Sequence, residues 1–174
     1  MIDFKNIEYL KEGNPRQKEA FKALKKYKIF ERLADYNPLL TGTIPIGIDL
    51  PESDLDVICS CSSLKSFEDF LIHEFQKEEQ FQISISHQEK VGAVVCSFMI
   101  DAFEVEVFGQ DKPTEHQNAY RHMLKEHQLL IKYGEKFRQK VIALKEGGLK
   151  TEPAFAKLLG LEGDPYQALL NVKV

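Results

Sequence analysis

Strict alternation of apolar and polar residues is confined to the middle of this chain, and that restricts the possible folds more than any other feature. Residues 81–86 and 103–108 place apolar side chains on one face and polar side chains on the other, as half-buried strands do. Residues 39–43 and 55–61 are also rich in β-forming types. Helical spacing dominates on both sides of this region. The pattern predicts an α+β fold with a short mixed sheet and flanking helices.

The N-terminal region predicts a helix with a well-defined start. Asn14 can cap free backbone amides, Pro15 suits the first turn, and Gln17 completes a capping box. In the middle region, residues 91–99 are expected to pair with the following strand as a hairpin that turns near Asp101. A connecting helix is expected before these later strands, where phenylalanine and leucine recur at helical spacing between Phe67 and Phe75.

No strand pattern returns after Pro113. We expect a long amphipathic helix over 114–133, a further helix closed by Gly147 and Gly148, and two short terminal helices. We interpret the chain as one domain over residues 1–174, with a sheet-containing core over 1–112 and a helical appendage over 113–174.

Length, composition and charge agree with that interpretation. The chain has 174 residues, 43% hydrophobic and 29% charged, which is an ordinary globular balance close to the roughly 150 residues of one domain. Lysine and arginine number 23 against 27 acidic residues, for a net charge of −4. Proteins that grip long nucleic acid usually carry a basic excess. A small molecule or a protein is therefore favoured as partner over long nucleic acid, and the oligomeric state is left open.

The cysteines and the apolar segments indicate the cellular compartment in which the protein is expected. Cys59, Cys61 and Cys96 are too few for a secreted disulfide scaffold and lack the spacing of a zinc site. The N-terminus has no apolar signal-peptide core. The longest uncharged apolar stretch, 91–100, is half of the roughly 20 residues that a membrane helix needs. We expect a soluble, cytoplasmic protein with reduced cysteines and no membrane contact.

Two aspartates carry the most informative chemistry. Asp54 and Asp56 are two positions apart at the start of a predicted strand, so their side chains share a face while Leu55 and Val57 point to the core. Two carboxylates held this close repel each other unless something neutralises them. Mg²⁺ or Mn²⁺, which prefer oxygen ligands, would do so.

A third carboxylate is expected from a later strand. Glu104 and Glu106 share one face of the segment 103–107, and periodicity alone does not separate them; we prefer Glu106 for its central position. Simpler interpretations stay open, since either glutamate could lie on a solvated sheet face. The aspartate pair could likewise belong to a solvated turn, and Gly42 could be a strand-end glycine with positive φ.

Gly42-Thr43, a loop, Asp54-Leu55-Asp56-Val57 and an acidic strand residue near Glu106 together resemble the nucleotidyltransferase superfamily, which has the DNA polymerase beta-like fold. This sequence has Thr43 where serine is usual in that family. Further segments resemble an uncharacterised bacterial branch of predicted nucleotidyltransferases, which brings no known substrate; they are 43–49, 117–122 and 150–155.

The resemblance implies transfer of a nucleoside monophosphate from an NTP to an unidentified acceptor by two-metal chemistry with Mg²⁺ or Mn²⁺. Asp54, Asp56 and Glu106 would be both the catalytic and the metal-binding residues, and Glu106 would also polarise the acceptor. Gly42 and Thr43 would contact the nucleotide phosphates. Arg121 would join them because an arginine fork suits phosphate, although a solvated arginine is the commoner outcome. The alternatives are a non-catalytic nucleotide- or protein-binding relative, regulatory or antitoxin-like, and a plain interaction domain.

Overall fold

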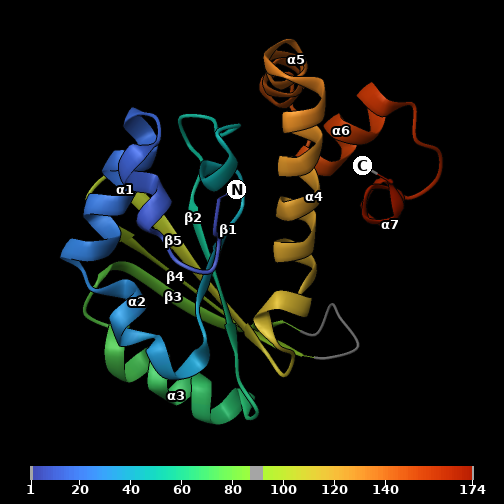
Figure 1. Ribbon diagram of the computed structural model, residues 1–174. Coiled ribbons are helices and arrows are strands. Elements are labelled where there is room, and N and C mark those ends of the chain that lie inside the picture. Colours follow the sequence, from blue (N-terminus) through green and yellow to red (C-terminus); the bar gives the residue numbers. More distant parts are fainter. Residues whose placement is uncertain (1, 87–91, 174) are drawn as a thin grey trace.

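A five-stranded mixed sheet forms the centre of the computed structural model, which describes residues 2–86 and 92–173 (Figure 1). The spatial order of the strands is β1-β2-β5-β4-β3, and β2 pairs with β5 in parallel while the other neighbours are antiparallel. The strands are β1 Leu39–Thr41, β2 Leu55–Ser60, β3 Glu79–Ser86, β4 Ala93–Ile100 and β5 Phe103–Gln110. The expected α+β class with a mixed sheet is confirmed.

Helices lie on both sides of this sheet (Figure 1). The α-helices are α1 Pro15–Lys26, α2 Ile29–Arg32, α3 Leu64–Phe75, α4 Asn118–Tyr133, α5 Glu135–Glu146, α6 Thr151–Leu159 and α7 Pro165–Asn171. Short 3-10 turns are η1 Glu8–Glu12, η2 Ala34–Tyr36, η3 Ile44–Ile46 and η4 Thr114–His116. Among the described residues, none of these helices combines the length and the apolar character that crossing a bilayer requires.

Local sequence rules explain where several elements begin and end. The predicted capping box is present: the Asn14 side chain accepts from the backbone N–H of Gln17, and the Gln17 side chain accepts from that of Asn14, both at 2.9 Å. The hairpin turn is also as predicted, since Ile100 pairs with Phe103 and Asp101 adopts a positive φ of 48°. The predicted start of that hairpin at Val91 lies outside the described residues.

Two predicted boundaries were wrong. The first strand ends at Thr41 and not at residue 43, because Gly42 turns into the left-handed region at a φ of 82°. The long helix begins at Asn118 and not at residue 114, because Gln117 has an extended backbone after η4. The Gln117 side chain donates to the carbonyls of Cys59 and Lys112, at 2.8 and 3.0 Å, which fixes this break.

Each face of the sheet packs differently. On the inner face, β-strand residues such as Leu55 and Val105 join α1 and α3 in one hydrophobic cluster. On the outer face, Leu39 and Ile58 join Tyr120 of α4 in a second cluster that also includes residues of α5, α6 and α7. Toward β3 the outer face carries exposed polar side chains instead, namely Gln82, Ser84 and Glu104. The helices after residue 113 therefore cover the β1–β2 end of the sheet.

Candidate active site

Five polar residues, one from each strand, form a row across the outer face of the sheet. Register pairs Thr41 with Asp56, Asp56 with Glu106, Glu106 with Ser97, and Ser97 with Gln82, and residues that are directly opposite share a face. Asp56 and Glu106 are thus immediate neighbours. Glu104 pairs with Met99 and is exposed, so the register places Glu106, and not Glu104, beside the aspartate.

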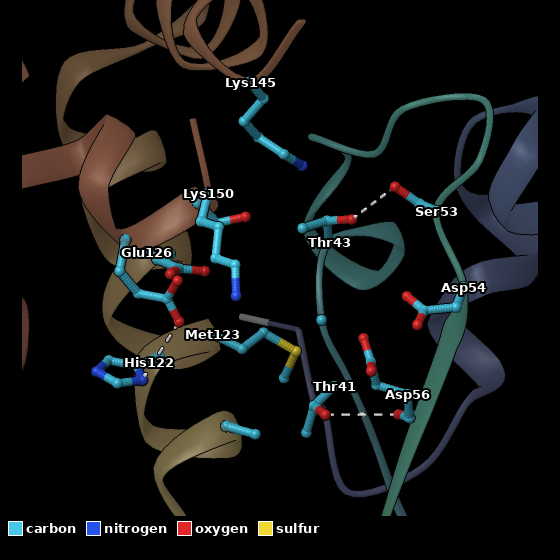
Figure 2. Close-up of a pocket in the computed structure, with 14 residues that line it drawn as sticks. Thr41, Thr43, Ser53, Asp54, Asp56, His122, Met123, Glu126, Lys145 and Lys150 are labelled. Carbon is cyan, nitrogen blue, oxygen red and sulfur yellow. Dashed lines mark hydrogen bonds and ion pairs between the residues drawn. The ribbon is translucent and has the colours of Figure 1, made fainter. Parts of the chain in front are cut away.

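A first cavity of about 510 Å³ opens beside this row. Its strand wall consists of Thr41, Gly42, Thr43, Ser53, Asp54 and Asp56, and its helical wall of Ala119, His122, Met123, Glu126, Lys145, Lys150, Thr151 and Glu152. Figure 2 shows the carboxylates of Asp54 and Asp56 pointing into the space between the two walls. The predicted aspartate pair therefore faces a cavity that the C-terminal helices close on the other side.

A second, smaller cavity of 230 Å³ lies next to the first. Thr41, Asp56 and Ala119 line both cavities. The remaining lining residues of the second cavity are Val57, Ile58, Glu106, Phe108, Gln110, Gln117 and Asn118. Asp56 thus lines both cavities, whereas Asp54 lines only the first and Glu106 only the second.

Gly42 is required by its contact with Asp56. Its φ of 82° lies in the left-handed region, and a Cβ built there would be 2.1 Å from Asp56 Oδ2. Any larger residue would be strained in its backbone and would displace the carboxylate. The glycine and the second aspartate, fourteen positions apart in the sequence, therefore form one unit of structure.

The loop between Gly42 and Asp54 is held by hydroxyl groups. Thr43 Oγ1 lies 3.3 Å from Ser53 Oγ (Figure 2). Ser53 Oγ also accepts from the Leu50 backbone N–H at 2.9 Å. From the other side, the α5 side chains of Arg138 and Lys145 donate to backbone carbonyls of the same loop. Arg138 reaches Ile46 and Gly47, and Lys145 reaches Ile48.

Within the part of the chain that the structure describes, the carboxylates of Asp54, Asp56 and Glu106 lie close together without a neutralising positive charge. Burial, followed by the charges of Asp54, Glu106 and Glu152, raises the pKa of Asp56 to about 7. Burial, followed by Asp54 and Glu104, also raises the pKa of Glu106. Among the described residues, no lysine, arginine or histidine forms an ion pair with Asp54, Asp56 or Glu106. The site therefore has excess negative charge that a bound cation would neutralise.

These donors fit a hard divalent cation. Carboxylate oxygens are the ligands that Mg²⁺ prefers, and Mg²⁺ usually takes only one or two carboxylates plus waters and substrate phosphates. Within residues 2–86 and 92–173, no three carboxylate, imidazole or thiol groups converge enough to hold an ion by themselves. An ion held here would thus be completed by ligands from a bound nucleotide.

The helical wall mixes basic and acidic groups. Lys145 and Lys150 extend into the first cavity (Figure 2). Glu126 is only 4% exposed, and burial together with Glu152 raises its pKa to about 8, while Lys145 opposes that shift. Burial lowers the pKa of Lys145, and nearby carboxylates, Glu126 first among them, oppose that shift. The lysines therefore bring positive charge opposite the aspartates.

His122 is held in one orientation on this wall. Its Nε2 lies 2.9 Å from the Tyr166 carbonyl oxygen, to which it must donate because a carbonyl only accepts. Its Nδ1 then faces Glu152, at 3.6 Å from Oε1. This contact joins α4 to α6 at the back of the cavity.

The structure brings together most of the residues singled out from the sequence. Gly42, Thr43, Asp54 and Asp56 line the first cavity, and Glu106 lines the second. Arg121 is not brought to either cavity: it is exposed, and its guanidinium donates to Asn118 Oδ1 at 3.4 Å. The residues that sequence reasoning did not identify are Ser53, His122, Glu126, Lys145, Lys150 and Glu152.

A family match accompanies this geometry. Residues 22–172 match a family model described as a domain of unknown function, DUF4269. The chain belongs to the DUF4269 family. No curated protein matches it in sequence.

Solved structures share the fold of this DUF4269 protein. The Cid1 poly(U) polymerase with MgGTP bound aligns with a TM-score of 0.56 at 15% identity, over 80% of this chain and 46% of the other. The GLD-2/RNP-8 complex gives 0.54 at 15% identity, over 83% and 56%. Cid1 with its short product ApU gives 0.53 at 14% identity, over 97% and 54%.

These similarities confirm the nucleotidyltransferase-like fold that the sequence motifs predicted. At 14–15% identity they show the fold alone. The DUF4269 chain spans about half the length of these proteins. The roles of individual residues and the bacterial origin of the family remain predictions.

Proposed function

We propose that this DUF4269 protein is a divalent-cation-dependent nucleotidyltransferase that moves a nucleoside monophosphate from an NTP to an acceptor. The observation that carries the proposal is the pair Asp54 and Asp56, which has no neutralising partner among the described residues and faces Lys145 and Lys150 across the first cavity, with Glu106 beside Asp56 on the next strand. A metal-bound triphosphate has the complementary pattern, with cations at one end and exposed negative oxygens at the other.

Each wall has its own role in this proposal. Asp54 and Asp56 would hold Mg²⁺ or Mn²⁺ from the strand wall, Glu106 would contribute from β5, and the nucleotide phosphates would supply the remaining ligands. When bound, the cation would neutralise these carboxylates and polarise the phosphoryl oxygens of the nucleotide. Gly42 would admit the phosphates close to the backbone, and Thr43 would present its hydroxyl to them.

The lysines would bind the phosphates that leave. Lys150 extends into the first cavity from the start of α6, and Lys145 enters it from the end of α5 (Figure 2). Because phosphoryl transfer depends mainly on positioning and charge stabilisation, two ammonium groups opposite the metal ligands are the chemistry that the leaving diphosphate needs. The fold shared with Cid1, a poly(U) polymerase whose structure contains MgGTP, supports this reading of the cavity.

A thermal-stability experiment tests the proposal. The purified chain would be heated with each of the four NTPs, with and without Mn²⁺. A ligand at one hundred times its Kd adds about 2.7 kcal/mol to the free energy of unfolding, and each kcal/mol raises Tm by about 2–4 °C for a chain of this size. We expect at least one NTP to raise Tm by about 5–10 °C, only when Mn²⁺ is present.

Two variants make the result specific. Asp56→Asn should abolish the cation-dependent shift. Glu104→Gln, which removes an exposed carboxylate from the same face of the sheet, should preserve it. An equal shift in Asp56→Asn and wild type would contradict the proposed site. Cation-dependent binding with no release of diphosphate, for any acceptor, would instead support the non-catalytic nucleotide-binding alternative.

A further inference from the structure

The second cavity has a chemistry of its own that the proposed function leaves unused. It shares Asp56 with the first cavity, but it contains Glu106, whereas Asp54, Gly42 and both lysines line only the first. The two cavities therefore meet at Asp56 and differ in the charged residues that line them.

In an in-line displacement, the two cavities would hold different parts of the reaction. The attacking and leaving oxygens lie opposite each other across the phosphorus atom. The leaving diphosphate is expected in the first cavity, where Lys145 and Lys150 supply positive charge. The attacking group must then approach from the side of Glu106, which is the second cavity.

The second cavity is lined by uncharged groups beyond its two carboxylates. Phe108 provides an apolar surface, and Gln110, Gln117 and Asn118 provide amides. Among the lining residues that the structure describes, none is lysine or arginine. Its 230 Å³ is less than the roughly 300–1,000 Å³ of pockets for drug-sized ligands, so it admits one small group.

Gln117 leaves a hydrogen-bond acceptor unused at this place. Its Nε2 donates to the carbonyls of Cys59 and Lys112, and these two acceptors determine which end of the amide is nitrogen. Its Oε1 is buried with no partner among the described residues. Because buried polar atoms are normally paired, this oxygen indicates a donor group on a bound molecule.

The sheet beyond Glu106 offers no positive charge for a polyanion. Strands β3, β4 and β5 contain no lysine or arginine, and the polar row continues from Glu106 through Ser97 and Gln82. A nucleic-acid strand on this face would meet Glu104 and Glu106 without the cations that neutralise phosphates. Arg121 contacts Asn118 from the exposed side of α4.

We propose, resting on the nucleotidyl transfer above, that the second cavity is the acceptor subsite and that it receives a small uncharged hydroxyl compound of the sugar or polyol class. The acceptor oxygen bonds to the α-phosphorus while the bond from that phosphorus to the bridging oxygen breaks. Diphosphate departs with the bridging oxygen, water takes up the hydroxyl proton, and the nucleoside monophosphate ester of the acceptor remains.

Matched pairs of compounds test this assignment. The full chain, saturated with Mg²⁺ and a non-hydrolysable NTP analogue, would be titrated with glucose, ribose and glycerol, and with their phosphate monoesters. A short oligoadenylate provides the nucleic-acid arm. Binding would be followed by ligand-observed NMR, and the Tm shift of the NTP analogue would be recorded in the same samples.

We expect the uncharged member of at least one pair to bind about tenfold more tightly than its phosphate ester and than the oligoadenylate. The phosphate groups would lie beside carboxylates with no cation among the described lining residues to pair with, and one hydrogen bond to a charged group is worth about this much. Asn118→Ala should weaken that binding about fivefold, as loss of one hydrogen bond does. Gln128→Ala, which removes an exposed amide on the same helix, should leave it unchanged.

Three results would overturn the assignment. The first is preferred binding of a phosphate ester or of the oligoadenylate, and its loss in Arg121→Ala would identify the arginine as the reason. The second is no binding by any uncharged compound while the Tm shift of the NTP analogue persists. Absence of that shift would overturn the proposed function together with this inference, so the two failures are distinguishable.

Discussion

The two walls of the first cavity differ in origin and in chemistry. The strand wall comes from residues 41–56 and carries aspartates with no ion-pair partner among the described residues. The helical wall comes from residues 119–152 and carries lysines, a fixed histidine, the buried Glu126 and the half-buried Glu152. One wall is suited to hold cations and the other to hold anions. The site exists only because tertiary packing sets them opposite each other.

The largest effect should come from the strand wall. Asp56→Asn keeps the shape of the side chain and removes the charge shared by both cavities. We expect nucleotidyl transfer to fall by about 10³-fold, corresponding to roughly 4 kcal/mol of transition-state stabilisation. Initial rates of diphosphate release measure this. A loss below tenfold would show that the aspartate is not at the reaction centre.

The strand wall could be predicted from the sequence because its residues are close together in the chain. Gly42, Asp54 and Asp56 lie close together in the chain, and strand alternation with one turn is enough to set them on one side. The choice between Glu104 and Glu106 needed the register of β2 with β5, since a period of two treats both alike.

The helical wall was missed because its residues are brought in by packing of distant helices. Lys145 sits in the last turn of α5, where a lysine usually complements the helix dipole in water. One signal was available: His122 and Glu126 are four positions apart and share a helix face with Met123. Two polar residues beside an apolar position on one face indicate a buried polar site.

A second prediction tests the contact between Gly42 and Asp56. Gly42→Ala places a methyl carbon only 2.1 Å from Asp56 Oδ2, at a position whose backbone is left-handed. We expect a stability loss of about 1–3 kcal/mol and a loss of transfer activity of about 10²-fold, as misplacement by about 1 Å produces. Urea unfolding and initial rates measure the two quantities. Gly148→Ala is the control, because its φ of 92° is equally strained but nothing lies within 4 Å of the added methyl.

The third prediction concerns the helical wall. Lys150→Ala removes a charge that faces the aspartates, and a hydrogen bond to a charged group contributes about 1.5–3 kcal/mol. We expect KM for the NTP to rise by roughly tenfold or more. Lys157→Ala provides a matched control, since that lysine is exposed on the same α6 helix. Equal effects of the two substitutions would remove Lys150 from phosphate binding.

The smallest effect is a dependence of stability on pH. Because the pKa of Glu126 is raised from 4.5 to about 8, the folded chain binds more protons than the unfolded chain between those pH values. This residue's contribution to the free energy of unfolding therefore falls as pH rises through that window. Glu126→Gln removes this dependence, so the free energy of unfolding of the variant should rise relative to that of wild type as pH increases from 5 to 8.

Urea unfolding of both proteins at several pH values between those limits measures this difference. A constant difference in free energy across the window would show that Glu126 is ionised in the folded chain at low pH. It would also indicate that the helical wall holds a carboxylate pair already neutralised by its lysines.

The contacts of Arg138 and Lys145 with the carbonyls of Ile46, Gly47 and Ile48 have a consequence for the order of events during synthesis. A nascent chain has made its whole sheet by residue 110, yet the loop between Gly42 and Asp54 still lacks the two side chains that hold it. Those side chains belong to α5 and are synthesised after the residues of α4. The first cavity is therefore completed only after α5 has been synthesised, although its aspartates lie far earlier in the chain.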